Sequence, residues 1–245
     1  SFENKGKIKI SKEVDTNSKI NEENALLNLN HAFCNNFYKI TIKDNSLMNK
    51  PLVVYHVTNN GANSTIFNSQ LNFNLEDSSS LKILDIFEDK SEKNFINVSY
   101  NFTLSENAIL KNFKIDKSQN KNIKYSYNNI DQLKDSISET FILSNGSKFL
   151  KNEINCNLNG KYSSAFINGV FSLDADKHHE IRTSVNHLVE NTKSYQLIKS
   201  VLDDSSKSVY QGKIYVSPEA QKTDGYQLSK CILLDKNTEF NAKPE

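Results

Sequence analysis

The sequence predicts an all-β fold, and three observations indicate it. About fifteen short runs in which apolar and polar residues alternate follow one another, among them FYKITI, PLVVYHV, FINVSYNFTL and SVYQGKIYV. Almost no helical pattern separates them, and residue pairs that favour turns stand between them, such as Asn159-Gly160 and Asp203-Asp204. A sandwich, a barrel and a parallel β-helix all satisfy this pattern. The even spacing of the runs up to the last residues favours the β-helix.

The chain divides into three predicted segments. Residues 1–21 are polar and charged, and we expect a flexible lead-in. Residues 22–35 place Ala25, Leu26, Leu29 and Phe33 at spacings of three and four, which predicts a short amphipathic helix. Residues 36–245 hold the strand pattern and form the predicted β core.

Charge and hydropathy exclude several function classes. Thirty basic and twenty-nine acidic residues leave a formal charge of +1, so no global field attracts nucleic acid or an anionic membrane surface. The only arginine is Arg182. No run reaches the roughly 18 apolar residues that a transmembrane helix needs, and the first residues lack the apolar centre of a signal peptide. We therefore expect no nucleic-acid or membrane partner.

The cysteines and histidines are the first candidates for chemistry. Cys34, Cys156 and Cys231 are far apart, which suits neither a disulfide framework nor a C-x-x-C metal site, and indicates a reducing compartment such as the cytoplasm. Cys231 could hold sulfur or a cluster, but a buried thiol that packs as a small apolar group is the simpler interpretation. Cys156 alternates with apolar residues and should face the core.

His178, His179 and His187 could form a metal or proton-transfer site. Adjacent strand residues face opposite sides, however, so His178 and His179 should not share a ligand set. These three histidines remain polar candidates without an assigned role.

Paired carboxylates at Asp174 with Asp176 and at Asp203 with Asp204 suit the acid-base chemistry of a β-helical polysaccharide lyase or hydrolase. Both pairs lie at predicted turns, where aspartate bonds the backbone, so a structural role is favoured. No phosphate loop, nucleophile elbow or metalloprotease motif is present. We expect no enzymatic activity and assign no catalytic, cofactor-binding or metal-binding residue.

The last third of the chain carries a long ordered resemblance. The segments VYQGKI from Val209, PEAQKTD from Pro218, Leu233-Leu234 and AKPE from Ala242 are similar to the SufB/SufD family, and the stretch from Lys177 to Asp204 is also similar to it. Ser200 stands where the family usually has glycine. The Gln221–Asp224 run resembles the SufD branch more than the SufB branch. The resemblance extends more loosely back to about residue 22.

The resemblance implies a right-handed parallel β-helix that acts as a non-catalytic scaffold for iron–sulfur cluster assembly. It implies pairing with SufB-like and SufC-like subunits, in the cytoplasm or a plastid-type organelle, with a cluster held transiently by the assembled complex and no cofactor bound by this chain alone. The family's Cys-Ser-His element and C-terminal helical region would follow Glu245 and are absent from this sequence. We expect the partner interface at Tyr226, Leu228, Cys231 and Leu233.

Three alternatives remain open from the residues. The chain could be a carbohydrate-active β-helix enzyme, or an adhesin or phage-type structural β-helix, although neither a secretion signal nor a trimer-forming segment is visible. In isolation it could also form a homodimer through an exposed strand edge.

Overall fold

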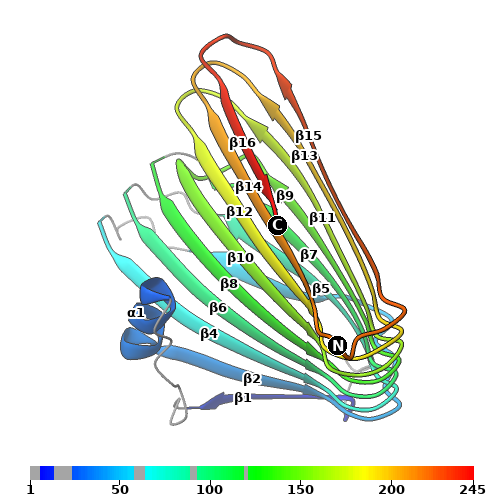
Figure 1. The fold of residues 1–245 in the computed structure, drawn as a ribbon. Coiled ribbons are helices and arrows are strands. Elements are labelled where there is room, and N and C mark those ends of the chain that lie inside the picture. The colour runs from blue at the N-terminus through cyan, green and yellow to red at the C-terminus, as the bar shows by residue number, and fades with distance from the viewer. Residues whose placement is uncertain (1–5, 14–23, 58–63, 89–92, 119–120) are drawn as a thin grey trace.

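The computed structural model describes residues 6–13, 24–57, 64–88, 93–118 and 121–245, which form a parallel β-helix (Figure 1). From β2 onward, consecutive strands alternate between two sheets, and each strand pairs in parallel with the strand that lies two further along the chain. The predicted fold class is confirmed, and the sandwich and the barrel are excluded.

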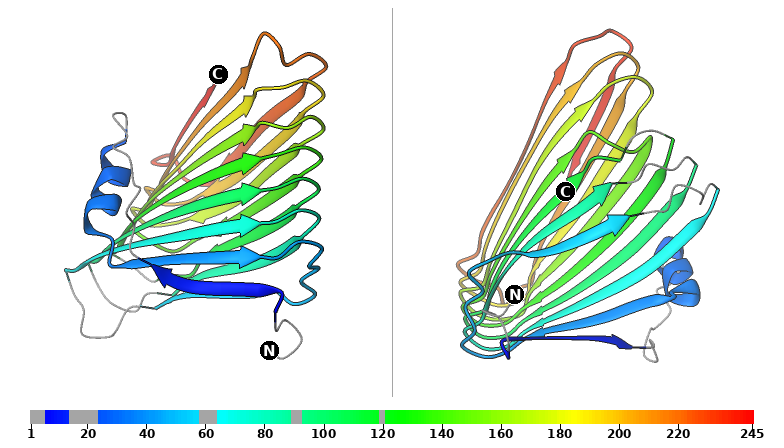
Figure 2. Two further views of the ribbon diagram at one scale, coloured as in Figure 1. Left: turned by 90° about the horizontal axis from the view of Figure 1, so that it is seen from below. Right: turned by 180° about the vertical axis from the view of Figure 1, so that it is seen from behind.

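The nine-stranded sheet consists of strands in the order β1 (Ile8–Glu13), β2 (Asn36–Ile42), β4 (Ile66–Leu75), β6 (Phe95–Leu104), β8 (Ile123–Gln132), β10 (Phe149–Leu158), β12 (His178–His187), β14 (Lys207–Val216) and β16 (Glu239–Pro244). The seven-stranded sheet contains β3 (Leu52–Val57), β5 (Ser80–Glu88), β7 (Ile109–Asp116), β9 (Ile137–Ser144), β11 (Ser164–Leu173), β13 (Lys193–Leu202) and β15 (Asp224–Leu233). Figure 2 shows the strands stacked one above another, with their turns aligned along one edge.

Strand β1 differs from the prediction for the first segment. Residues 8–13 were expected in a flexible lead-in, but they pair antiparallel with β2, from Ile8 opposite Ile42 to Glu13 opposite Phe37. The edge of β2 supplies the unpaired backbone groups that this strand needs. The rest of the predicted lead-in, apart from residues 6 and 7, lies outside the described residues.

The predicted helix is present as α1 (Ala25–Phe33), but it buries a different face. The Asn24 side chain caps it by accepting a hydrogen bond from the Leu27 amide at 2.9 Å. Leu27 and Asn30 are buried, whereas Phe33 is exposed. Asn30 determines this orientation, because its Nδ2 donates to the carbonyl oxygens of Asn97 and Ser69 on the sheet.

A recurring turn connects the nine-stranded sheet to the seven-stranded one. One residue has a left-handed backbone, as at Ser78 (φ 55°) and Asp135 (φ 56°). The next residue is often a serine whose hydroxyl donates to the carbonyl three residues earlier, as from Ser136 to Leu133 at 2.6 Å. Such local bonds compete with regular structure and fix the turn. Repetition of this turn keeps the strands in register.

Gly160 is required at one of these turns for a steric reason. A Cβ added at this position would overlap the backbone of Leu133 and Lys134 in the neighbouring coil. The coils therefore approach one another too closely there for any side chain.

We expect Gly160→Ala to lower the free energy of unfolding by about 1–3 kcal/mol, because overlap with rigid backbone forces the coils apart. Urea denaturation followed by circular dichroism measures the change. Ser172→Ala, on the exposed outer side of β11, is the matched control and should stay within about 0.5 kcal/mol of the parent. Equal effects of the two substitutions would contradict the close approach.

Candidate functional site

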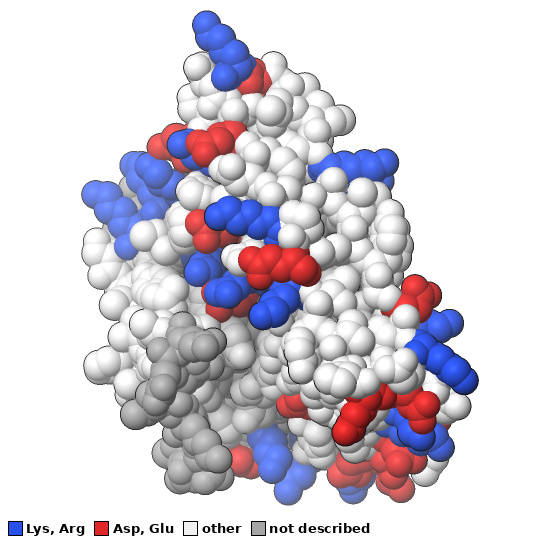
Figure 3. All heavy atoms as spheres, in the orientation of Figure 1, with Lys and Arg blue, Asp and Glu red and all other residues white. Residues whose placement is uncertain are grey.

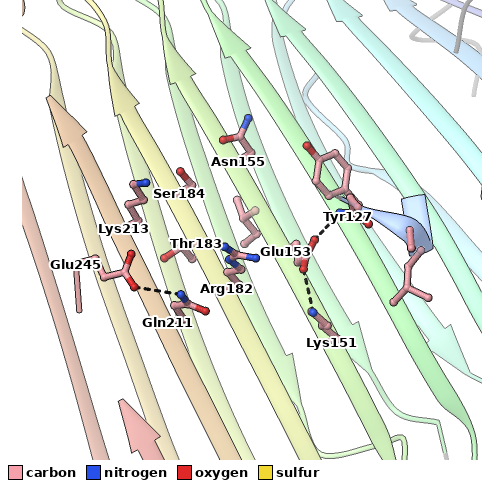
Figure 4. Close-up of a pocket in the computed structure, with 14 residues that line it drawn as sticks. Tyr127, Lys151, Glu153, Asn155, Arg182, Thr183, Ser184, Gln211, Lys213 and Glu245 are labelled. Atoms are coloured by element: carbon pink, nitrogen blue, oxygen red, sulfur yellow. Dashed lines mark hydrogen bonds and ion pairs between the residues drawn. The ribbon is translucent and has the colours of Figure 1, made fainter. Parts of the chain in front are cut away.

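A pocket of about 480 Å³ lies on the outer face of the nine-stranded sheet, beside the first turn of α1 (Figure 4). Strands β8, β10, β12 and β14 each contribute outward side chains, so residues far apart in the sequence meet there. The polar residues that line the pocket include Tyr127, Lys151, Glu153, Asn155, Arg182, Ser184, Gln211, Lys213 and Glu245. Figure 3 shows basic and acidic side chains gathered near the middle of this face.

Glu153 connects three elements at the edge of this pocket. Its Oε2 accepts hydrogen bonds from the Tyr125 hydroxyl and from Nδ2 of Asn24, both at 2.7 Å. Its Oε1 lies 3.2 Å from Nζ of Lys151. Burial and the Glu153 charge raise the pKa of Tyr125, so this phenol remains a hydrogen-bond donor. The carboxylate therefore joins β8, β10 and the N-terminal end of α1.

Arg182 and Lys213 give the pocket its surplus positive charge. Neither side chain has an ion-pair partner among the described residues, and Gln211, which is in register with Arg182, donates to Oε1 of Glu245 at 3.3 Å. This arrangement can receive an anionic group. Across the described residues, no three His, Cys, Asp or Glu side chains lie close enough together to hold a metal ion.

The structure separates the three candidate histidines. His178 lies on the outer face, 3.2 Å from Oε1 of Glu180, whereas His179 is buried inside the coil, as the alternation predicted. His187 is also buried, at the other end of β12, where its two ring nitrogens lie 2.7 Å from Oγ1 of Thr192 and 2.9 Å from Oγ of Ser194. They do not form one site.

His179 is held by the last residue of β9 and by the loop that follows this strand. Its Nε2 lies 2.9 Å from the carbonyl oxygen of Ser147, and its Nδ1 lies 3.3 Å from Oγ of Ser144. Burial lowers the pKa of this imidazole to about 4, although the Ser147 carbonyl favours the protonated form. The ring is therefore neutral at pH 7.

The expected interface residues all lie on β15, the outermost strand of the seven-stranded sheet. Tyr226 and Leu228 are on its outer side, and Tyr226 stacks on Tyr195 of β13 with ring centroids 5.0 Å apart. Cys231 and Leu233 are on the inward side, in register with Ser200 and with Leu202 of β13. Cys231 is half-buried against the core, and burial raises the pKa of its thiol. The other predicted core thiol, Cys156, is fully buried.

The sequence of this chain is similar to those of known proteins. A family model described as SUF system FeS cluster assembly, SufBD core domain, matches residues 56–245, well over half of the chain. This chain belongs to the SufBD core family. The iron-sulfur cluster assembly protein SufD of Escherichia coli (strain K12) is 23% identical over 224 residues, which cover 89% of this chain and 52% of that protein. The chain thus spans about half the length of this relative, and the resemblance to SufD is confirmed.

The interior of this SufBD core chain holds charges that sequence analysis missed. Asp85 is fully buried, and its two carboxylate oxygens lie 2.9 Å from Nζ of Lys114 and 2.8 Å from Nε2 of His56. The Tyr100 hydroxyl lies 3.1 Å from the same His56 nitrogen, and the Lys114 ammonium stands 3.4 Å from the centroid of the Tyr100 ring. The sequence did contain a signal for this buried charge. In KILDIF, which starts at Lys82, Asp85 occupies an inward position of an alternating strand.

The opposite charges in this network stabilise one another. Burial alone would raise the pKa of Asp85, but the charges of Lys114 and His56 hold it well below its usual range. Burial lowers the pKa of Lys114, and Asp85 offsets part of that effect. Each charge is tolerated inside the coil only because the other is present.

We expect Asp85→Ala to lower the free energy of unfolding by about 3–5 kcal/mol, because it leaves the Lys114 charge buried without a partner. Asp176→Ala is the matched control, since it breaks an exposed ion pair with Lys148 and should leave the stability close to that of the parent. Urea denaturation at pH 7 measures both. The double variant Asp85→Leu with Lys114→Met should recover most of the loss. If Asp85→Ala alone were as stable as the control, the network would not support the core.

Protonation of His179 gives a second prediction. An unfolded histidine binds its proton near pH 6.5, whereas folded His179 does so near pH 4. The unfolded state therefore binds more protons between these values, and stability should fall by up to about 3 kcal/mol as pH is lowered through this range.

His179→Gln should remove much of that loss, and His178→Gln, on the outer face, should retain it. Urea midpoints at pH 7, 6, 5 and 4.5 measure the slope. Identical slopes for the two variants would contradict the assignment to the buried ring.

Proposed function

We propose that this chain is a non-catalytic scaffold for iron–sulfur cluster assembly that works together with SufB-like and SufC-like subunits. The observation that carries the proposal is the match to the SufBD core family over residues 56–245, which include nearly all of the β-helix. The name of its E. coli relative, an iron-sulfur cluster assembly protein, supports the same role. The cluster is the cargo of the assembled complex and not a resident group of this chain.

The state of the polar side chains supports a scaffold role over catalysis. Glu153 is engaged by Tyr125, Asn24 and Lys151, and Asp174 is paired with Lys177 in a turn. Groups held in this way are poorly placed for acid-base transfer to a substrate. Cys156 and Cys231 are free thiols, which supports a reducing compartment such as the cytoplasm or a plastid-type organelle.

We place the contact with the SufB-like subunit at the β15 end of the coil, at Tyr226, Leu228, Cys231 and Leu233. Apolar side chains on this strand would exclude water from the contact. Leu233 is 51% exposed and Tyr226 is 46% exposed, which supports a surface that a partner covers.

The full-length protein tests the proposal. Mixed with purified SufB-like and SufC-like subunits at physiological salt, it should elute as one complex, with its mass measured by light scattering. Leu233→Lys should weaken the association by about tenfold or more, because a charge replaces apolar contact at the interface. Leu133→Lys is the matched control, since Leu133 is also exposed but lies in a turn at the opposite edge of the coil.

The amount of cluster assembled, monitored by absorbance, should decrease only in proportion to the loss of the complex. Failure of the parent protein to bind either subunit would overturn the proposed function. Equal effects of Leu233→Lys and Leu133→Lys would contradict the assignment of the contact to β15.

A further inference from the structure

The outer face of the seven-stranded sheet carries rows of apolar side chains that no described element covers. The strand registers align residues from successive coils into rows that run across the strands. One row contains, in order from β5 to β15, Leu84, Phe113, Phe141, Asn168, Leu197 and Leu228. Five of its six members are apolar, and Phe113 and Phe141 are in ring contact at 6.4 Å between centroids.

The two rows that flank this one change in opposite ways from β5 to β15, one from apolar to charged residues and the other from charged to aromatic residues. On one side the row reads Ile86, Ile115, Leu143 and Val170, and then Lys199 and Lys230. On the other side it begins with Lys82, Lys111 and Glu139 and continues with Phe166, Tyr195 and Tyr226. The apolar surface is therefore a band that crosses the sheet obliquely, with lysines at two opposite corners. We call it the oblique band.

The fold itself does not require this apolar surface. The outer face of the nine-stranded sheet is built on the same ladder but carries asparagines that bond one another between coils. Asn155 donates to Asn129 at 2.8 Å, and Asn186 donates to Asn157 at 2.8 Å. The outer face of the nine-stranded sheet thus carries amide side chains that water can solvate. The outer face of the seven-stranded sheet instead exposes Phe113, Leu143 and Tyr195 to about two fifths of their area. A contiguous exposed apolar surface of this kind marks an interaction site.

The charges at the margins define the partner. Lys82, Lys199 and Lys230 have no carboxylate within ion-pair distance among the described residues. The nearby acids are already engaged, since Glu139 pairs with Lys111 at 2.9 Å and Glu88 accepts from the Tyr55 hydroxyl. Of the outward carboxylates on β5 to β15, Asp224 alone has no ion-pair partner among the described residues, so a second copy of this face would supply one carboxylate to three lysines. A partner with acidic residues beside an apolar stripe would satisfy them.

We propose that the oblique band docks an amphipathic helix of a partner protein, with Asp or Glu along the margins of the apolar stripe. Five strand spacings separate β5 from β15, so the band is about 24 Å long, the length of a helix of about 16 residues. Helices ordinarily cover apolar sheet faces, as α1 covers part of the other sheet here. The band is centred on β7, β9 and β11. It shares Tyr226 and Leu228 with the proposed SufB-like contact, but Leu233 lies on the other side of β15 and outside the band.

Synthetic peptides test the chemistry directly. The probe is a fluorescein-labelled helical peptide of about 18 residues, with leucines at i, i+3, i+4 and i+7 and glutamates on both margins, and its twin carries lysines at the margins. Fluorescence anisotropy with the full-length protein should show the glutamate peptide binding at least about tenfold more tightly than the lysine twin.

Charge exchange makes the test specific. Lys199→Glu with Lys230→Glu should weaken the glutamate peptide by about tenfold and strengthen the lysine twin. Lys39→Glu, at an exposed lysine of β2 on the other sheet that has no ion-pair partner among the described residues, should change neither affinity. Phe141→Lys should weaken both peptides, and Thr103→Lys on the opposite sheet should weaken neither. Circular dichroism confirms that each variant is folded.

Several outcomes would overturn the proposal. These are no binding of the glutamate peptide, equal binding of the two peptides, or an effect of Lys39→Glu as large as that of the Lys199 and Lys230 exchange. A homodimer that Phe141→Lys dissociates would instead assign the band to a second copy. Leu233→Lys should leave peptide binding unchanged, so failure of this proposal and failure of the SufB-like contact are distinguishable.

Discussion

In-register parallel pairing between every second strand is the constraint on which the rest of the structure depends. Each strand from β4 to β14 is hydrogen-bonded on both sides by strands 26 to 33 residues away, so a slip of one residue would turn every inward side chain outward. Turns in which a left-handed residue is followed by serine or threonine fix that register at most coils. The constraint produces one interior and two outer faces, and each has its own chemistry.

The interior chemistry follows from this arrangement. A residue's position in the strand decides whether it is buried, and the hydrogen-bonded ladder then gives it no freedom to move out. His178 and His179 differ in environment for that reason alone. Asp85 and Lys114, placed inside from neighbouring coils, are stable only as a pair. Many polar groups inside this SufBD core therefore bond one another, as Asp85 and Lys114 do.

Much of the fold could be predicted from the sequence, because alternation along a strand is a local property. The strands, the inward position of Cys156 and the turn roles of Asp174 and Asp203 were predictable in this way. The antiparallel strand β1 was not, since its six residues acquire their conformation from a partner about thirty residues away. The buried face of α1 was also missed, because buried hydrogen bonds from Asn30 outweigh the apolar periodicity of the helix.

The candidate site was harder to predict than the fold. Arg182 and Glu153 are adjacent only because β10 and β12 pair in one register, and periodicity within a strand carries no information about register between coils. The same holds for the oblique band, whose rows are assembled from six strands. The family resemblance identified the chain's last third correctly, yet its motifs say nothing of which outward residues align. Register is therefore the information that the structure adds.

Electron paramagnetic resonance distances test this register most directly. With Cys34, Cys156 and Cys231 replaced, one pair of spin labels would be attached at Thr103 and Tyr215, which share an outward row four strand spacings apart. A second pair at Lys82 and Tyr226 would span five spacings on the other sheet. We expect backbone separations of about 19 Å and about 24 Å. Distances that do not increase with the number of intervening coils would contradict the parallel, in-register coil and every placement that depends on it.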